Sequence, residues 1–305
     1  MNVYSVFVFA VLAISSVSGI INLGGGKKCG GNGGYGNGGY GSGIVIGSSR
    51  NIIYISKRHE KRVEEDSHSK YIYSNLAVSK HLGNNIFELA SLLGISRVLH
   101  RIPVIFVYNQ TYNEMLNRVN NSIPGLLDQY LFLNESIPRD VKSLDFNIKC
   151  CIFENPNKLL SINDRFLHLT GLYYQSFKYF SGMQNELKSY LRKIPEQSFR
   201  LPSSSSKNHI SCIHIRRGDF FKVGFHVADE RFIRKTIKLI RRKETHPGQQ
   251  ITFVLFGDDL PFLKHLQKTA DKDQKTNYFV SKNSVTEDLV YAMNNCDSVF
   301  ISGEF

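Results

Sequence analysis

The chain has 305 residues, which is enough for one large domain or for two domains of ordinary size. Its hydrophobic fraction of 42% supports a sizeable core. The formal net charge of +12 suits an anionic partner, but the basic residues are spread along the chain among Asp and Glu. The charge alone therefore does not indicate nucleic-acid binding.

The first 50 residues differ in composition from the rest. An uncharged apolar run at 3–21 ends in small residues, which is typical of a cleavable signal peptide (1–21). The run is also nearly long enough to act as a signal anchor in a bilayer. Residues 22–50 are rich in glycine and poor in side chains that could form a core, so we expect them to be disordered.

Three N-glycosylation sequons agree with passage through the secretory lumen, at Asn109, Asn120 and Asn134. The five cysteines lack the spacing of a metal site; they are Cys29, Cys150, Cys151, Cys212 and Cys296. The lumen permits a disulfide, but the sequence leaves the pairing open. The adjacent Cys150 and Cys151 would point to opposite faces of a strand, so we do not expect them to bond to each other.

An N-terminal domain is predicted over 51–200. It opens with a strand at 71–77, a break at 81–85, a helix with an apolar stripe from 86 to 98, and a second strand at 103–108. In a doubly wound domain the N–H groups near Gly83 and Asn84 would face a ligand, although an ordinary turn and cap explains them equally well. A further strand is predicted at 146–154. The aromatic residues of 166–180 favour core over a sugar-stacking surface.

The polar segment 201–207 predicts a linker to a C-terminal domain at 208–305. There, strands and helices alternate regularly, which indicates a parallel sheet with right-handed crossovers. The predicted strands are 210–215, 251–256, 278–280 and 298–301, and the helices are 229–243, 260–270 and one from a capping box at Ser284 to Asn294. The basic side chains of the first helix are interpreted as a solvated face opposite Phe232, Ile233, Ile237 and Ile240.

The strand at 210–215 ends in His214, Arg216, Arg217 and Asp219. Two arginine forks at the carboxyl edge of a sheet match the oxygens of a pyrophosphate, so the pattern predicts a nucleotide-linked substrate. A plain charged turn is one alternative. Another is an adhesion ligand, because Arg217-Gly218-Asp219 is a known adhesion tripeptide; that reading requires the tripeptide to be exposed.

Four motifs in this order resemble the α-1,2-fucosyltransferase family, particularly its large nematode branch, and the resemblance covers about residue 52 to the end. The His-x-Arg-Arg-x-Asp element carries the most weight, since it is specific to transferases that use GDP-fucose. The motifs are Leu82–Glu88 (LGNNIFE), Tyr173–Phe180 (YYQSFKYF), His214–Asp219 (HIRRGD) and Phe256–Asp259 (FGDD).

The resemblance implies an α/β, GT-B-like fold with two Rossmann-like, doubly wound halves facing a cleft. The N-terminal domain (51–200) would lie on the acceptor side, and the C-terminal domain (208–305) would bind GDP-fucose. It implies inverting transfer of L-fucose from GDP-fucose to a glycan hydroxyl in the secretory pathway, in the Golgi lumen or membrane, without a metal ion or other cofactor. Arg216 and Asp219 would be catalytic. The donor would be bound by His214, Arg216, Arg217, Asp219, Asp258, Gly83 and Asn84.

Two departures from the family follow from the sequence. Members continue beyond the last strand into a tryptophan-containing segment, whereas this chain ends at Phe305 and contains no tryptophan, so the C-terminal half and the donor site are expected to be incomplete. Members are held in the Golgi by an uncleaved anchor, whereas a cleaved leader would give a secreted protein. An inactive relative that binds a glycan or nucleotide is the alternative to an enzyme.

Overall fold

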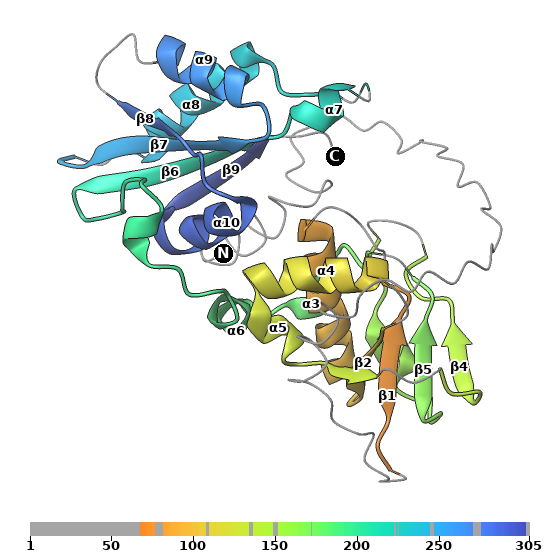
Figure 1. The fold of residues 1–305 in the computed structure, drawn as a ribbon. Helices are drawn as coiled ribbons and strands as arrows, with labels where there is room; N and C mark the ends of the chain where they lie inside the picture. The colour runs from red at the N-terminus through yellow and green to blue at the C-terminus, as the bar shows by residue number, and fades with distance from the viewer. Residues whose placement is uncertain are drawn as a thin grey trace.

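The computed structural model describes residues 68–76, 82–107, 110–133, 137–148, 152–171, 173–222, 224, 226–244, 247–270 and 276–302. The predicted leader, the glycine-rich segment, Asn109, Asn134, Cys29, Cys150 and Cys151 lie outside them. Two parallel sheets, each with its own helices, account for most of the described chain (Figure 1). The predicted α/β class with parallel sheets is confirmed.

The first sheet has the strand order β3-β2-β1-β5-β4, and all four pairings are parallel. Its strands are β1 (Tyr71–Ser74), β2 (Ile102–Phe106), β3 (Leu131–Leu133), β4 (Val141–Leu144) and β5 (Phe166–Leu169). The predicted strand at 146–154 is wrong, because the described residues of that stretch form none. Asn147 has a left-handed backbone (φ 55°), and its N–H donates to the Glu154 carboxylate instead of a neighbouring strand.

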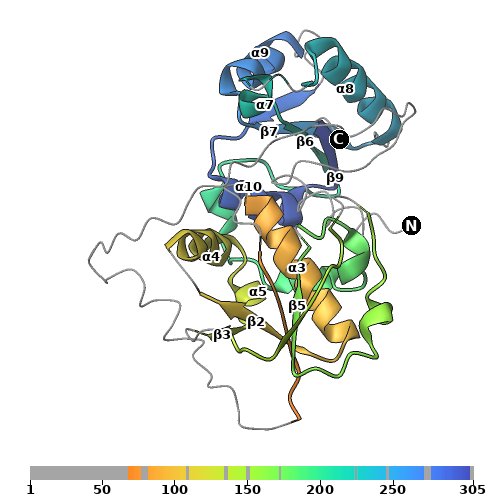
Figure 2. The same cartoon turned by 90° about the vertical axis from the view of Figure 1, so that its right-hand side faces the viewer.

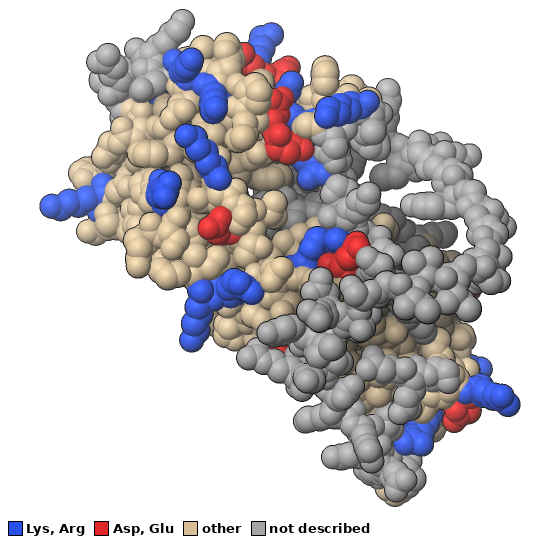
Figure 3. Space-filling model, viewed as in Figure 1, with Lys and Arg blue, Asp and Glu red and all other residues tan. Residues whose placement is uncertain are grey.

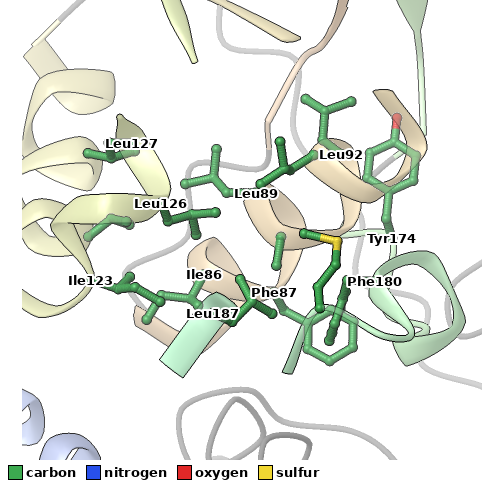
Figure 4. Close-up of a cluster of buried hydrophobic side chains, with 14 of the residues drawn as sticks. Ile86, Phe87, Leu89, Leu92, Ile123, Leu126, Leu127, Tyr174, Phe180 and Leu187 are labelled. Carbon is green, nitrogen blue, oxygen red and sulfur yellow. The ribbon is translucent and has the colours of Figure 1, made fainter. Parts of the chain in front are cut away.

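Helix α3 (Leu82–Val98) is the centre of the first half. It starts earlier than predicted, so Gly83 and Asn84 lie in its first turn, and it is buried on all sides from Gly83 to Ser96. Figure 4 shows it between α5 (Pro124–Leu127) and the segment that carries Tyr174 and Phe180. A Cβ on Gly94 would lie 1.9 Å from the Tyr179 carbonyl oxygen, so only glycine permits this packing.

The remaining elements of the first half pack around α3, and the aromatic segment contributes three buried side chains to the core, whereas Phe177 is exposed. Tyr174, Tyr179 and Phe180 are buried, and Asn147 Nδ2 donates to the Tyr179 hydroxyl at 2.5 Å. The elements are α4 (Gln110–Ser122), η1 (Pro156–Leu159), η2 (Phe177–Phe180), α6 (Gln184–Ser189) and η3 (Glu196–Ser198).

The second sheet has the parallel order β8-β7-β6-β9, and its strands and long helices match the prediction. A short helix, α7 (Gly218–Lys222), was not predicted. Phe232 is also a correction: it is 56% exposed, whereas Ile233, Ile237 and Ile240 are buried. The elements are β6 (Asn208–Ile215), α8 (Glu230–Glu244), β7 (Gln250–Gly257), α9 (Leu260–Ala270), β8 (Asn277–Val280), α10 (Val285–Asn295) and β9 (Ser298–Ser302).

Helix α10 joins the two halves. Helices α8 and α9 cover one face of the second sheet, while α10 lies on the other face, next to α3 and α4 of the first half (Figures 1 and 2). Thr286 Oγ1 lies 2.6 Å from Ser122 Oγ of α4, and Lys188 Nζ donates to the Met293 carbonyl at 3.0 Å. Residues of α10 share one buried apolar cluster with α3, so the halves are joined by a continuous core.

The segment 201–207, predicted as a linker, is held by polar contacts. The Tyr291 hydroxyl donates to the Pro202 carbonyl at 2.5 Å, and Ser204 Oγ donates to the Asp297 carboxylate at 2.7 Å. Cys212 of β6 and Cys296 at the end of α10 form a disulfide. Among the described residues, no helix is long and apolar enough to cross a membrane.

The buried carboxyl group of Asp288 in α10 should make the stability of the protein depend on pH. Burial is the main cause that raises its pKa to about 7, and Ser281 Oγ donates to its Oδ1 at 2.5 Å. The folded state thus holds a proton that the unfolded chain releases near pH 4, so this group makes stability fall as pH rises from about 4 to 7. In Asp288→Asn, urea unfolding should show a gain of about 1–3 kcal/mol at pH 8 relative to wild type, and little gain at pH 4. An equal effect at both pH values would contradict the assignment.

Candidate functional site

Arg216 lies at the position where open α/β sheets bind ligands. In the second sheet the chain runs from β6 outward to β7 and β8, and then returns to place β9 on the other side of β6. The carboxyl ends of β6 and β9 therefore form the topological switch point. Arg216 is the first residue after β6, and its N–H donates to the carbonyl of Ser302, the last residue of β9, at 3.3 Å.

The Arg216 guanidinium faces an acidic neighbour. Its Nε lies 3.7 Å from Oδ2 of Asp258, and 18% of its side chain is exposed. Asp258 follows directly after β7, the strand next to β6. A partly exposed arginine held at this edge can present paired N–H donors to an anionic ligand.

Asp258 organises the turn that follows β6. Its Oδ1 accepts the N–H groups of Arg217 and Gly218, each at 2.9 Å. Burial raises the pKa of this carboxyl, but the two N–H groups and Arg216 outweigh burial and keep the pKa below its ordinary value. A Cβ on Gly218 would lie 2.9 Å from Oδ2, so glycine allows this close approach. Through these contacts Asp258 holds the turn after β6 beside Arg216.

The Arg217 guanidinium is engaged by other parts of the second half. Its Nε donates to Asp259 Oδ2 at 3.2 Å, its Nη1 donates to the Ala228 carbonyl at 2.8 Å, and its guanidinium carbon is 4.0 Å from the centre of the Phe262 ring. Only 16% of its side chain is exposed. Arg217 therefore fixes α9 and the 226–229 segment against the strand end, and this engaged guanidinium does not match an exposed adhesion tripeptide.

His214 is buried in β6, two residues before Arg216. Burial and, to a lesser degree, the nearby Arg216 together lower its pKa to about 4, so the ring is neutral at pH 7. Its Nδ1 has no hydrogen-bond partner among the described residues. Asp219 lies in α7, and its side chain is outside what the structure describes.

The first sheet has a matching switch point between β1 and β5. The chain runs from β1 outward to β2 and β3, and β5 lies on the other side of β1. Helix α3 begins beyond the β1 end, so Gly83 and Asn84 lie at this edge. Glu88 lies one turn further along α3, and it was not predicted as a site residue from the sequence. An acidic residue in an otherwise apolar helix was the signal that could have identified it.

One of the predicted sequons can be placed in the structure. Asn120 is half-buried in α4. Its sequon partner Ser122 is buried and forms a hydrogen bond with Thr286. A hollow of about 400 Å³ lies at the seam between the halves and contains none of the predicted donor residues; it is lined by Asn121, 192–195, Ser198, Ser284, Thr286 and Glu287. Within the described ranges, no cluster of three or more His, Cys, Asp or Glu could hold a metal ion.

On the face shown in Figure 3, the charges of the described residues add no second candidate. On this face the described lysine and arginine side chains are scattered over the second half and do not merge into one band (Figure 3). Those of α8 surround a buried stripe of Ile233, Ile237 and Ile240. The interpretation of α8 as a helix with a solvated basic face is consistent with this view.

These features define a class: an α/β protein of two parallel sheets with an arginine at the switch point of its second sheet. The sequence profile of glycosyl transferase family 11 matches residues 47–305. That match covers more than half of the chain, and the chain belongs to glycosyl transferase family 11.

Relatives in Caenorhabditis elegans agree. The chain is 39% identical over 245 residues to the protein svh-11, named as a galactoside 2-alpha-L-fucosyltransferase, with 79% of this chain and 67% of that protein covered. It is 29% identical over 220 residues to a galactoside 2-alpha-L-fucosyltransferase, with 70% and 53% covered. The chain thus spans about half to two thirds of the length of these relatives.

The first 50 residues match a different family, described as fungus-induced protein. Over 51 residues the chain is 69% identical to fungus-induced protein 3 of Caenorhabditis elegans, which is 16% of this chain and 94% of that protein. The change in composition near residue 50 therefore coincides with a change of sequence family.

Two solved structures align with 79% of this chain at 9% identity. One is POFUT1 in complex with GDP-fucose, with a TM-score of 0.43 and 99% of that chain covered. The other is an Arabidopsis thaliana FUT1 mutant in complex with GDP, with a TM-score of 0.46 and 68% covered.

The role of Asp258 in the turn predicts a stability difference between two substitutions. Asp258→Ala leaves the Arg217 and Gly218 N–H groups without their acceptor, which should lower the free energy of unfolding by about 1–3 kcal/mol. Asp258→Asn keeps an oxygen that can accept both, so it should lose less. Urea denaturation of the two variants measures the difference. Equal losses would show that the two hydrogen bonds from the Arg217 and Gly218 N–H groups do not contribute to stability.

Proposed function

We propose that the chain is a galactoside 2-alpha-L-fucosyltransferase-like enzyme that transfers L-fucose from GDP-fucose to a glycan hydroxyl in the secretory pathway, in the Golgi lumen or membrane or as a secreted protein. Its membership of glycosyl transferase family 11 and the names of its relatives support this reaction class. The observation that carries the proposal is the position of Arg216 at the switch point of the second sheet.

In this proposal, Arg216 contacts the diphosphate of the donor. The bond between fucose C1 and the β-phosphate oxygen breaks, the electron pair leaves with GDP, and the guanidinium stabilises the negative charge that develops there. The acceptor hydroxyl attacks C1 from the opposite face, so the β-linked donor gives an α-linked product. The hydroxyl proton passes to a base that remains unassigned.

The other predicted donor residues divide between two roles. Asp258 and Arg217 hold the strand-end turn in place through protein contacts and position Arg216. His214 is a buried, neutral neighbour of Arg216. Asp219 lies in the same short helix as Gly218 and is proposed to bind the donor. Gly83 and Asn84 are proposed to contact the donor from the first half. We propose that Arg216 supplies the positive charge for which other transferases use a divalent ion.

The test is transfer from GDP-fucose to phenyl β-galactoside, measured by GDP release and by mass of the product, in the presence of EDTA. The expected result is a fucosylated product with an α-linkage and a rate that is unchanged when magnesium is added. Binding of GDP is measured in parallel by calorimetry. GDP binding without transfer would support a nucleotide-binding relative, and absence of both would overturn the proposal.

A further inference from the structure

The turn after β5 holds two consecutive residues in a backbone conformation that aromatic residues disfavour. Tyr173 has φ 65° and Tyr174 has φ 41°. Left-handed backbone costs of the order of 1 kcal/mol or more for each such residue and persists only where the surroundings enforce it. Strain of this kind is common where a protein must hold a side chain in place for a ligand.

Buried polar contacts from two other elements enforce this turn. Glu88 of α3 is 1% exposed, and its Oε1 accepts the Tyr173 N–H at 3.0 Å. Ser91 Oγ donates to the Tyr174 carbonyl at 2.9 Å, and the Tyr174 hydroxyl lies 2.9 Å from Ser74 Oγ at the end of β1. A polar side chain is costly to bury in the core unless it is hydrogen-bonded, and this one accepts the N–H of the turn.

The turn lies at the switch point of the first sheet, where the ends of β1 and β5 meet. Gln175 belongs to the same edge, since its Nε2 donates to Asn84 Oδ1 in the first turn of α3 at 3.2 Å. Tyr174 is fully buried, but Tyr173 and Gln175 on either side keep part of their side chains exposed. The rigid turn thus presents one aromatic ring and one amide at the ligand-binding edge of this half.

We infer that the turn at 173–175 binds the hexopyranose ring of the acceptor, with Tyr173 and Gln175 as its contacts and Glu88 as their positioning residue. This rests on the proposed function and adds the acceptor subsite to it. An aromatic ring packs against the apolar face of a pyranose, and an amide exchanges hydrogen bonds with its hydroxyl groups. Preorganisation by Glu88 and Ser91 lowers the entropy cost of binding.

The test uses phenyl β-galactoside as the probe and does not require turnover. Saturation-transfer NMR with the full chain and GDP should show contact with the galactose ring protons. In Tyr173→Ala the Kd for the galactoside should rise about tenfold, the loss expected for one aromatic contact. Tyr173→Phe keeps the ring and should bind the galactoside as wild type does.

Phe177→Ala is the matched control, because Phe177 is a nearby aromatic residue that is 43% exposed but lies outside the turn. It should leave the galactoside Kd unchanged. Equal Kd values for Tyr173→Ala and wild type would overturn the inference, as would wild type that shows no galactose contact. GDP binding, measured on the same samples, reports on the proposed function separately.

Glu88 is tested by rescue. Glu88→Ala should lose galactoside binding while GDP binding persists, because the Tyr173 N–H loses its acceptor while Arg216 of the second half keeps its surroundings. Glu88→Gln keeps an oxygen acceptor and should restore most of the binding. Parallel loss of galactoside and GDP binding in Glu88→Ala would indicate general unfolding and contradict the positioning role.

Discussion

Arg216→Ala should lower kcat/KM for fucosyl transfer by about 10²–10³-fold, which is typical for removal of a group that stabilises charge in a transition state. The side chain is partly exposed at a strand end and fills no part of the apolar core, so the thermal unfolding midpoint should stay close to that of wild type. GDP release assays and thermal denaturation of the same preparation measure the two quantities.

Two variants give this experiment its controls. Arg216→Lys keeps the charge but loses the paired donors, so it should recover only part of the lost rate. Arg231→Ala removes an exposed basic residue from α8 and should transfer fucose as wild type does. Full activity of Arg216→Ala would remove the phosphate-binding role from this residue and leave the strand end as a charged turn.

The double variant Cys212→Ala/Cys296→Ala should lose about 2–5 kcal/mol of unfolding free energy, because the disulfide joins residues 84 positions apart and restricts the unfolded chain. Both sulfurs are buried between β6 and α10, so the smaller alanines also leave unfilled space. Since Arg216 directly follows β6 and α10 contacts the first half, fucosyl transfer should be lost at a lower temperature as well.

Urea unfolding with and without dithiothreitol checks this expectation. Wild type should become less stable in the reductant, whereas the double variant should not respond to it. A wild-type transition that is the same in both buffers would mean that the bond is absent from the folded protein in solution.

The predictions from sequence held where a local pattern was enough. Alternation of apolar strands with amphipathic helices predicted every element from β6 to β9 except α7, and the capping box at Ser284 starts α10 as expected. The prediction failed at 146–154, because the apolar side chain of Phe146 is buried by tertiary packing while the left-handed Asn147 interrupts the strand. Apolar content alone cannot distinguish a buried irregular segment from a strand.

The sequence by itself determined the α/β class, the family resemblance and the location of Arg216 at a strand end, because each depends on neighbours within a few residues. The tertiary structure alone decided that Arg217 turns to Asp259 and Phe262, that Cys212 pairs with Cys296, and that Glu88 fixes the turn at Tyr173. Those partners are about 40 to 85 positions apart. Which of them meet depends on strand order and helix packing, and these arise only when the whole core forms.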